Sequence, residues 1–235
     1  MIVLGIETST PQTSVALGTE QEILASLSVS GRAGREAVTP ALAQLLSWTG
    51  LELAQVGAVA VGIGPGLFTG LRAGVETAKT LAQVLRLPIL GVCGLDALAY
   101  AHRHTHKRIA AVIDARRSEV FLATYRPVPG GVLRETEPMV CSPERCSAEL
   151  EAIGGEVLAV GNGAMLYRHE LERPGARIEV GSTLSAHPEA AAIVELSAPR
   201  FLREEHDRPV DVLPLYLRKS DAEILWDRRG RGVPA

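Results

Sequence analysis

The sequence predicts an α/β protein made of two similar lobes. Short, nearly continuous apolar runs, such as residues 2–6, are typical of strands that are buried on both faces. The pattern of residues 59–72 predicts a strand, a Gly-Pro-Gly turn and the start of a helix. Two short patterns also occur once in each half of the chain, which indicates a duplicated unit.

The two repeated patterns are an acid at the end of a first strand and a glycine turn between a strand and a helix. Ile6-Glu7-Thr8 corresponds to Ile113-Asp114-Ala115, and Ile63-Gly64-Pro65-Gly66 corresponds to Val160-Gly161-Asn162-Gly163. The duplicated unit is β-β-β-α-β-α. We therefore expect one lobe over residues 1–105 and a smaller lobe over 106–235, joined by a linker near 103–108. The final helix is expected to stay with the second lobe or to return to the first.

The individual elements follow from periodicity. Alternating or continuous apolar residues predict strands, and apolar residues at intervals of three and four predict helices. In the first lobe the predicted elements are strands 2–6, 14–18 and 23–29, helix 36–49, strand 56–63, helix 70–85, strand 88–92 and a short helix at 96–102. In the second they are strands 109–113, 120–125 and 132–140, helix 143–153, strand 157–160, helices 164–171 and 188–202, an extended segment at 210–217 and a basic tail at 226–231.

The two kinds of corner are the first candidate functional residues. A glycine turn that leads from a strand into a helix directs backbone N–H groups at one point, which favours an anion or a closely packed protein neighbour. Glycine is also what such a corner needs for purely structural reasons, and Thr8 and Ser9 are also common partners of turn backbone groups. Two facing lobes would bring both corners to one cleft. We expect this cleft to be a vestigial nucleotide site. Its predicted lining is Glu7, Thr8, Ser9, Gly64, Pro65, Gly66, Asp114, Gly161 and Gly163.

Small residues follow one side of helix 70–85. Gly66, Gly70, Gly74, Ala78 and Ala82 occur at every fourth position. Glycine inside a helix costs about 1 kcal/mol relative to alanine, so a close neighbour is expected at Gly74. This neighbour is either the protein's own sheet or a partner helix, and we predict a partner. The predicted interface consists of Val38, Leu42, Leu45, Gly70, Gly74, Ala78 and Ala82.

Composition narrows the class of protein. Hydrophobic residues make up 46% of the 235 residues and charged residues 22%, which is ordinary for a globular protein. A net charge of −3 does not suggest an independent nucleic-acid-binding protein. The three cysteines have no metal-ligand spacing, and His102, His104 and His106 are expected to form a solvated basic stretch rather than a metal site. No leader or membrane segment is apparent, so we expect a cytoplasmic protein.

At this point the residues resemble a known family. Gly5-Ile6-Glu7-Thr8-Ser9, the stretch from Gly62 to Arg72, the stretch from Ile113 to Val120 and Tyr216-Leu217-Arg218 are similar to the bacterial TsaB (YeaZ) family. The resemblance extends from Met1 to about Leu217. It implies the duplicated ASKHA fold of actin, hexokinase and the Hsp70 ATPase domain, which contains two ribonuclease-H-like lobes.

The resemblance also implies a role and partners. Members of this family take part in making N6-threonylcarbamoyladenosine (t6A) at position 37 of tRNAs that read codons starting with A. The family member is a non-catalytic partner of the transferase TsaD, and the ATPase TsaE joins the pair. We therefore expect a TsaD heterodimer, a ternary complex with TsaE, a homodimer through the same helices when alone, and only indirect contact with tRNA. No cofactor, metal or membrane is expected.

Two other classes of function remain open from the sequence. One is an ASKHA-type kinase or ATPase that would use Glu7 or Asp114 together with residues 64–66. The other is a metallopeptidase-like activity of the kind once attached to relatives of TsaD. Those relatives carry a His-x-x-x-His pair on the first long helix, whereas residues 34–39 here are Gly-Arg-Glu-Ala-Val-Thr.

Overall fold

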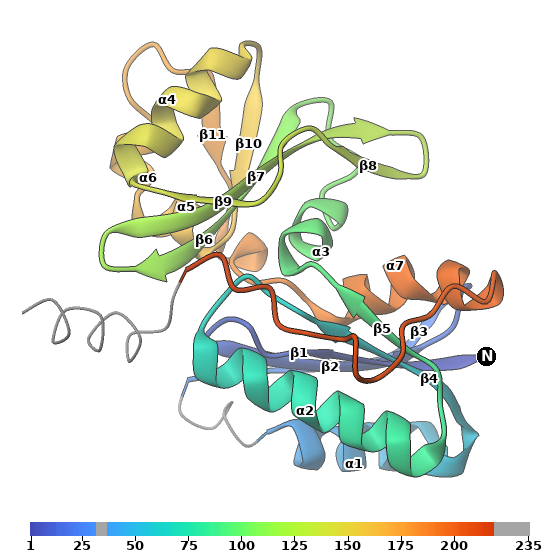
Figure 1. Cartoon of the computed structure of the whole chain (residues 1–235). Helices are drawn as coiled ribbons and strands as arrows, with labels where there is room; N and C mark the ends of the chain where they lie inside the picture. The colour runs from blue at the N-terminus through green and yellow to red at the C-terminus, as the bar shows by residue number, and fades with distance from the viewer. Residues whose placement is uncertain (32–36, 219–235) are drawn as a thin grey trace, which may run out of the picture.

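Two β-sheets, each covered by helices, make up the computed structural model, which describes residues 1–31 and 37–218. Figure 1 shows the first sheet below the second, with α3 and α7 in the space between them. Residue 36 of the predicted first helix and the predicted basic tail lie outside the described residues.

The first sheet has five strands in the order β3-β2-β1-β4-β5. The first three strands form an antiparallel meander, and β1 pairs in parallel with β4, which pairs in parallel with β5. Helices cover both faces of the central strands, which explains why these strands read as continuous apolar runs. The strands are β1 (Ile2–Glu7), β2 (Gln12–Gly18), β3 (Ile23–Ser30), β4 (Val56–Gly62) and β5 (Ile89–Val92).

Two pairs of helices enclose this sheet. The helices α1 (Val38–Thr49) and α2 (Phe68–Leu85) pack on one face, where they share a hydrophobic cluster with β1, β2 and β4. The helices α3 (Gly94–Tyr100) and α7 (Ala190–Leu202) pack on the other face. The last helix within residues 37–218 therefore lies on the first sheet. A short 3-10 helix, η2 (Leu53–Gln55), precedes β4.

The second sheet repeats the strand order of the first. Its order is β11-β10-β6-β7-β8, which is the arrangement of the first sheet with β6 in the place of β1 and β10 in the place of β4. This equivalence confirms the predicted duplication. The strands are β6 (Arg108–Arg116), β7 (Glu119–Val128), β8 (Gly131–Arg134), β9 (Met139–Cys141), β10 (Val157–Val160) and β11 (Ile178–Val180). The helices are α4 (Pro143–Ile153), α5 (Asn162–Leu166), α6 (Arg168–Leu171) and the 3-10 helix η3 (Thr183–Ser185).

Two predicted elements differ from the structure, and one strand was not predicted. The strand expected at 132–140 is two strands, β8 and β9, which pair with different parts of β7. Pro138 lies between them and has no N–H to donate to a ladder, so the chain leaves the sheet there. The helix expected at 164–171 is divided into α5 and α6 at Tyr167, and β11 was not predicted because its run of three residues is too short to show a period.

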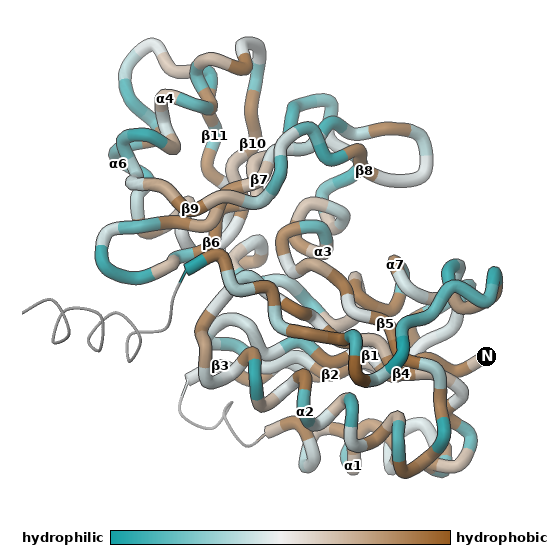
Figure 2. Tube along the Cα trace, viewed as in Figure 1, coloured by the Kyte–Doolittle hydropathy of each residue, from teal (hydrophilic) through white to brown (hydrophobic). Residues whose placement is uncertain are grey.

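Hydropathy follows these layers. In Figure 2 the strands inside each lobe are mostly brown, and much of the outer chain is teal or white. Among the described residues, none of the helices combines the length and the apolar character needed to cross a membrane.

An ionic contact fixes α3 to the second sheet. The Asp96 carboxylate accepts hydrogen bonds from the Tyr125 hydroxyl at 2.7 Å and from the Arg134 guanidinium at 3.0 and 2.5 Å. Tyr125 is almost completely buried, and α3 also packs on the first sheet. This contact therefore helps to hold the two lobes together.

The end of the described chain also connects the lobes. We call residues 207–218 the C-terminal strap. Asp207 N donates to Ile89 O at the edge of the first sheet, and Leu215 N donates to Ile63 O at 2.7 Å. The Tyr216 ring stacks on Phe68 of α2, with 5.1 Å between ring centroids. The strap then reaches the second lobe, where Arg218 donates to the Glu119 carboxylate at 2.9 Å.

Replacing Asp96 should destabilise the protein much more than replacing another acid that pairs with Arg134. In Asp96→Ala the buried Tyr125 hydroxyl loses its acceptor, and we expect a loss of about 1–3 kcal/mol in the free energy of unfolding. Glu137→Ala is the control. This side chain is 90% exposed and lies 3.4 Å from the same guanidinium group, so its ion pair contributes little. Urea unfolding would measure both variants, and equal effects would contradict this assignment.

Candidate functional site

The first corner is formed where β1 ends at Glu7. The Glu7 side chain is completely buried, and its Oε1 atom accepts a hydrogen bond from Ser9 N at 2.5 Å. Its Oε2 atom lies against Gly62, where a Cβ would overlap it. Within the described residues, neither Glu7 Oε2 nor the buried Ser9 hydroxyl has a hydrogen-bond partner.

Burial changes the acidity of this carboxyl group. Loss of solvent raises the pKa of Glu7 to about 6, against an ordinary value of 4.5. Hydrogen bonds from residues 8 and 9 oppose this rise, and the nearby Glu189 carboxylate adds to it. Glu7 therefore titrates close to neutral pH.

The glycine turn is packed against the same corner. A Cβ at Gly66 would overlap Ser9 O, and a Cβ at Gly70 would overlap Thr8 O. The Leu67 N–H donates to Ser9 O at 2.6 Å, and the Thr8 hydroxyl donates to Gly70 O at 2.7 Å. The close neighbour of the Gly-Pro-Gly turn is thus the chain's own backbone at residues 8 and 9.

The structure therefore brings most of the first set of predicted residues together. Glu7, Thr8 and Ser9 meet the turn that contains Gly64, Pro65 and Gly66. Gly64 O also accepts a hydrogen bond from Gly94 N, at the start of α3. Sequence reasoning missed Gly62 and Gly94, which border the Glu7 carboxyl group, because an isolated glycine gives no signal of what lies beside it.

The second corner has a similar construction. Asp114 N donates to the side chain of Asn162 at 3.1 Å, and a Cβ at Gly161 would overlap Val112 O. A Cβ at Gly163 would lie 2.9 Å from Asp114 N. The Asp114 carboxylate accepts a hydrogen bond from Arg116 N at 2.8 Å and pairs with the Arg116 guanidinium at 3.2 Å. Both oxygens of this acid are thus engaged locally.

The predicted interface residues are part of the core, which corrects the prediction from the sequence. Gly74 is buried, and a Cβ there would overlap the Thr8 hydroxyl oxygen. Gly70 faces the backbone of Thr8. The remaining members of the predicted interface are buried in the cluster under the first sheet: Val38, Leu42, Leu45, Ala78 and Ala82. The small residues of this helix therefore pack against the protein's own sheet and first corner, and not against a partner helix.

The opposite face of the same two helices is exposed. On α1 the exposed positions include Thr39, Ala43 and Ser47, and on α2 they include Thr69, Ala73 and Thr80. Two large apolar side chains also reach solvent here, since Trp48 is 65% exposed and Val84 is 74% exposed. We call this surface the outer helix face.

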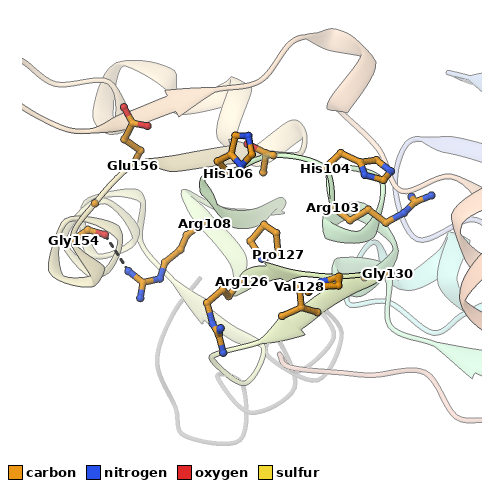
Figure 3. A pocket seen from close by; sticks show the side chains of 14 residues that line it. Arg103, His104, His106, Arg108, Arg126, Pro127, Val128, Gly130, Gly154 and Glu156 are labelled. Carbon is orange, nitrogen blue, oxygen red and sulfur yellow. Dashed lines mark hydrogen bonds between the residues drawn. The ribbon is translucent and has the colours of Figure 1, made fainter.

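A separate cavity of about 630 Å³ lies in the second lobe. It is lined by residues 103–106, Arg108, residues 126–131 and residues 154–156, and Figure 3 shows it from close by. None of the predicted corner residues lines it. His104 and His106, which we expected to be only solvated, belong to its wall. Among residues 1–31 and 37–218, no three His, Cys, Asp or Glu side chains come together as a metal site.

Comparison with solved structures defines the class of protein. A ROK hexokinase from Thermus thermophilus has the same fold, with a TM-score of 0.51 over 87% of this chain and all of that chain, at 13% identity. The structure described as YeaZ from Pseudomonas aeruginosa is much more similar. It has a TM-score of 0.78 and 32% identity, and the match covers 92% of this chain and 99% of that one. The protein therefore has the duplicated two-lobe fold of the actin and hexokinase class.

Sequence relatives identify the family within this class. The family model described as "TsaD: tRNA N6-adenosine threonylcarbamoyltransferase" matches residues 28–226. The tRNA threonylcarbamoyladenosine biosynthesis protein TsaB of Escherichia coli K12 is 30% identical, over 97% of this chain and 98% of the relative. The chain belongs to the TsaB (YeaZ) family.

Adding a single methyl group at Gly74 should destabilise the protein. In an exposed helix Gly→Ala stabilises by about 1 kcal/mol, but here the new Cβ collides with the Thr8 hydroxyl, which is held by Gly70 O. We expect Gly74→Ala to lose about 1–3 kcal/mol in thermal or urea unfolding. Gly131→Ala is the control, because a Cβ there meets nothing. A Gly74→Ala protein as stable as the parent would contradict the packing described. A bulky residue at Gly74 should disrupt the fold still more, because even its Cβ would overlap the Thr8 hydroxyl oxygen.

Glu7 should make stability depend on pH. An acid with a raised pKa stabilises the fold only while it is protonated, so its contribution is present below pH 4.5 and is lost as the pH rises through 6. The loss is about 2 kcal/mol by the usual conversion of a pKa shift. Urea unfolding of the parent and of Glu7→Gln from pH 4.5 to 8 would measure it. The parent should lose about 2 kcal/mol relative to the variant, and parallel curves would refute this.

Proposed function

We propose that this chain is a non-catalytic subunit of the assembly that forms t6A on tRNA in the cytoplasm. It pairs with the threonylcarbamoyltransferase TsaD through the outer helix face and contributes to the site that receives TsaE. One observation carries this proposal, namely the chemical character of the outer helix face. Membership of the TsaB family supports the choice of pathway and of partner.

The outer helix face carries fewer charges than a solvent-facing pair of helices normally does. The sequence of α1, Val38 to Thr49, contains no charged residue at all. Along α2 the small stripe of Thr69, Ala73, Thr77 and Thr80 continues to Val84 without a charge. A surface helix of a globular protein usually carries charged residues opposite its buried stripe. Arg72 and Glu76 are exposed beside the α2 stripe. The uncharged helix α1 and the uncharged stripe of α2 therefore support a face that is covered by another protein.

Two hydroxyl groups of the outer helix face already have acceptors. The Thr77 hydroxyl donates to Ala73 O at 2.7 Å, and the Thr80 hydroxyl donates to Glu76 O at 2.8 Å. These hydroxyls make their hydrogen bonds inside the helix, so covering them leaves no donor unpaired. Small side chains also allow the backbones of two helix pairs to approach closely. The face therefore suits a helical bundle formed with a chain of the same fold.

The closed corners support a non-catalytic subunit. A phosphoryl-transferring enzyme needs its acid and its glycine turn to face the substrate. Here the Glu7 carboxyl group lies against Gly62, and the turn is covered by residues 8 and 9. The Asp114 carboxylate is engaged by Arg116. The predicted nucleotide cleft is thus best explained as a remnant whose contacts now serve the fold.

A charge placed on the outer helix face should prevent complex formation. Ala73→Glu adds a carboxylate at an exposed position of α2 that the partner would have to desolvate. We expect a loss of affinity for TsaD of at least about 100-fold, because an unpaired buried charge costs roughly 3–5 kcal/mol. Calorimetric titration with TsaD from the same organism would measure it.

The matched control is the same substitution on a helix of the second lobe. Ala148 is exposed on α4, so Ala148→Glu changes the charge equally at a distance from the outer helix face. It should bind TsaD like the parent. Normal binding by Ala73→Glu, or equal loss in both variants, would contradict the proposed interface.

The proposed function is tested by reconstitution. A mixture of TsaD, TsaE, threonylcarbamoyl-adenylate and tRNA should form t6A rapidly only when this chain is added, and Ala73→Glu should restore little of the activity. The chain alone should neither hydrolyse ATP nor modify tRNA. Turnover by the lone chain would favour the kinase or ATPase class instead.

A further inference from the structure

The cavity of the second lobe lies at the end of the sheet opposite to the Asp114 corner. It is bounded by the start of β6 at Arg108, the end of β7 at residues 126–128 and the residues that precede β10. Asp114, in contrast, lies near the carboxyl end of β6. The cavity is therefore a separate feature that neither corner nor the outer helix face explains.

Cationic side chains predominate in its wall. Three arginines and two histidines line it, together with one acid, Glu156. Arg108 and Arg126 are both near the Glu135 carboxylate, at 3.1 and 3.4 Å. One carboxylate thus serves two guanidinium groups, whereas Arg103 has its own partner in Glu195 at 3.0 Å.

The two guanidinium groups differ in how firmly they are held. Arg108 Nη1 donates to Ile153 O at 3.1 Å and to Gly154 O at 3.2 Å, which fixes this side chain. Arg126 is 54% exposed, and its pairing with Glu135 uses Nε. In Figure 3 both side chains lie at one side of the cavity, with His104 and His106 across from them. Arg126 can therefore present the outer edge of its guanidinium group to a ligand.

The rest of the wall is smooth and partly apolar. A Cβ added at Gly130, Gly131, Gly154 or Gly155 would meet nothing within 4 Å, so these residues leave the backbone accessible. Pro127, Val128 and Pro129 supply apolar surface beside the arginines. A volume of about 630 Å³ is in the range of sites for ligands larger than a single phosphate.

We propose that this cavity binds a nucleotide, with a phosphate on Arg108 and Arg126 and the base against the wall of residues 127–129. Guanidinium groups match the geometry and charge of phosphate oxygens, and a flat base suits an apolar wall. The nucleotide is either free or one unit of an RNA chain. In the second case this chain contacts RNA directly, contrary to the expectation from the sequence.

Binding of two probes separates these sources. ATP and a single-stranded RNA of twelve uridines would each be titrated into the full chain, with calorimetry for ATP and fluorescence anisotropy for RNA. The affinity for at least one probe should fall roughly tenfold or more in Arg126→Glu, because a charge-assisted contact is replaced by repulsion. Arg145→Glu is the matched control, since Arg145 is 65% exposed on α4, outside the cavity, and should bind like the parent.

A second variant tests the cavity without changing its charge. Gly131→Leu places a side chain where the structure has open space, so binding should be lost while thermal stability is retained. If this variant loses binding of ATP, the natural ligand is a free nucleotide. If it loses binding of RNA alone, the ligand is one unit of an RNA chain. No binding of either probe by the parent, unchanged binding in Gly131→Leu, or equal losses in Arg126→Glu and Arg145→Glu would overturn the proposal.

Discussion

The contact between the corner at residues 7–9 and the glycine side of α2 determines the architecture of the first lobe. Backbone meets backbone there, because Gly66 and Gly70 have no side chain to separate the helix from Thr8 and Ser9. The distance of α2 from the sheet follows from this contact. The hydrophobic cluster that also contains α1 depends on that distance. In proteins packed as densely as crystals, such a position tolerates almost no added volume.

The same contact explains why the outer helix face is available. Because α2 buries its smallest residues, its larger apolar residues Leu71 and Val75 fill the core beside them, and Ala73 and the threonines are left outside. The buried side of the helix is thus free of charge, and on its solvent side Arg72 and Glu76 flank an uncharged stripe. The buried side is covered by the protein's own sheet, and the uncharged stripe beside the uncharged helix α1 is the surface that a partner can cover. This is the physical basis of the proposed subunit contact.

Much of the fold could be predicted from the sequence, since long periodic segments and the two repeated corners carry strong signals. The strand at 157–160 and the helix at 143–153 agree with β10 and α4. We predicted that a partner helix, and not the protein's own sheet, packs against Gly74, and this prediction was wrong. Periodicity shows that one face of a helix has small residues but not what lies against that face. The cavity was not predicted, since its arginines, histidines and glycines come from three distant segments that only the tertiary structure joins.

The acid at the first corner shows what chemistry the sequence could and could not reveal. Glu7 at the end of a strand indicates a functional carboxylate as readily as a structural one. Its complete burial against Gly62 depends on neighbours from β4 and α3, which no local pattern specifies. The altered pKa is thus a property of the assembled corner rather than of the residue type.

The C-terminal strap gives the molecule a fixed geometry. It is attached to Ile63 and Phe68 in one half and to Glu119 in the other, and the Asp96 contact ties the halves together at a second place. Two separated attachments oppose the hinge bending by which two-lobed enzymes close on their substrates. A partner that binds one lobe would therefore hold the other lobe in a constant orientation relative to itself.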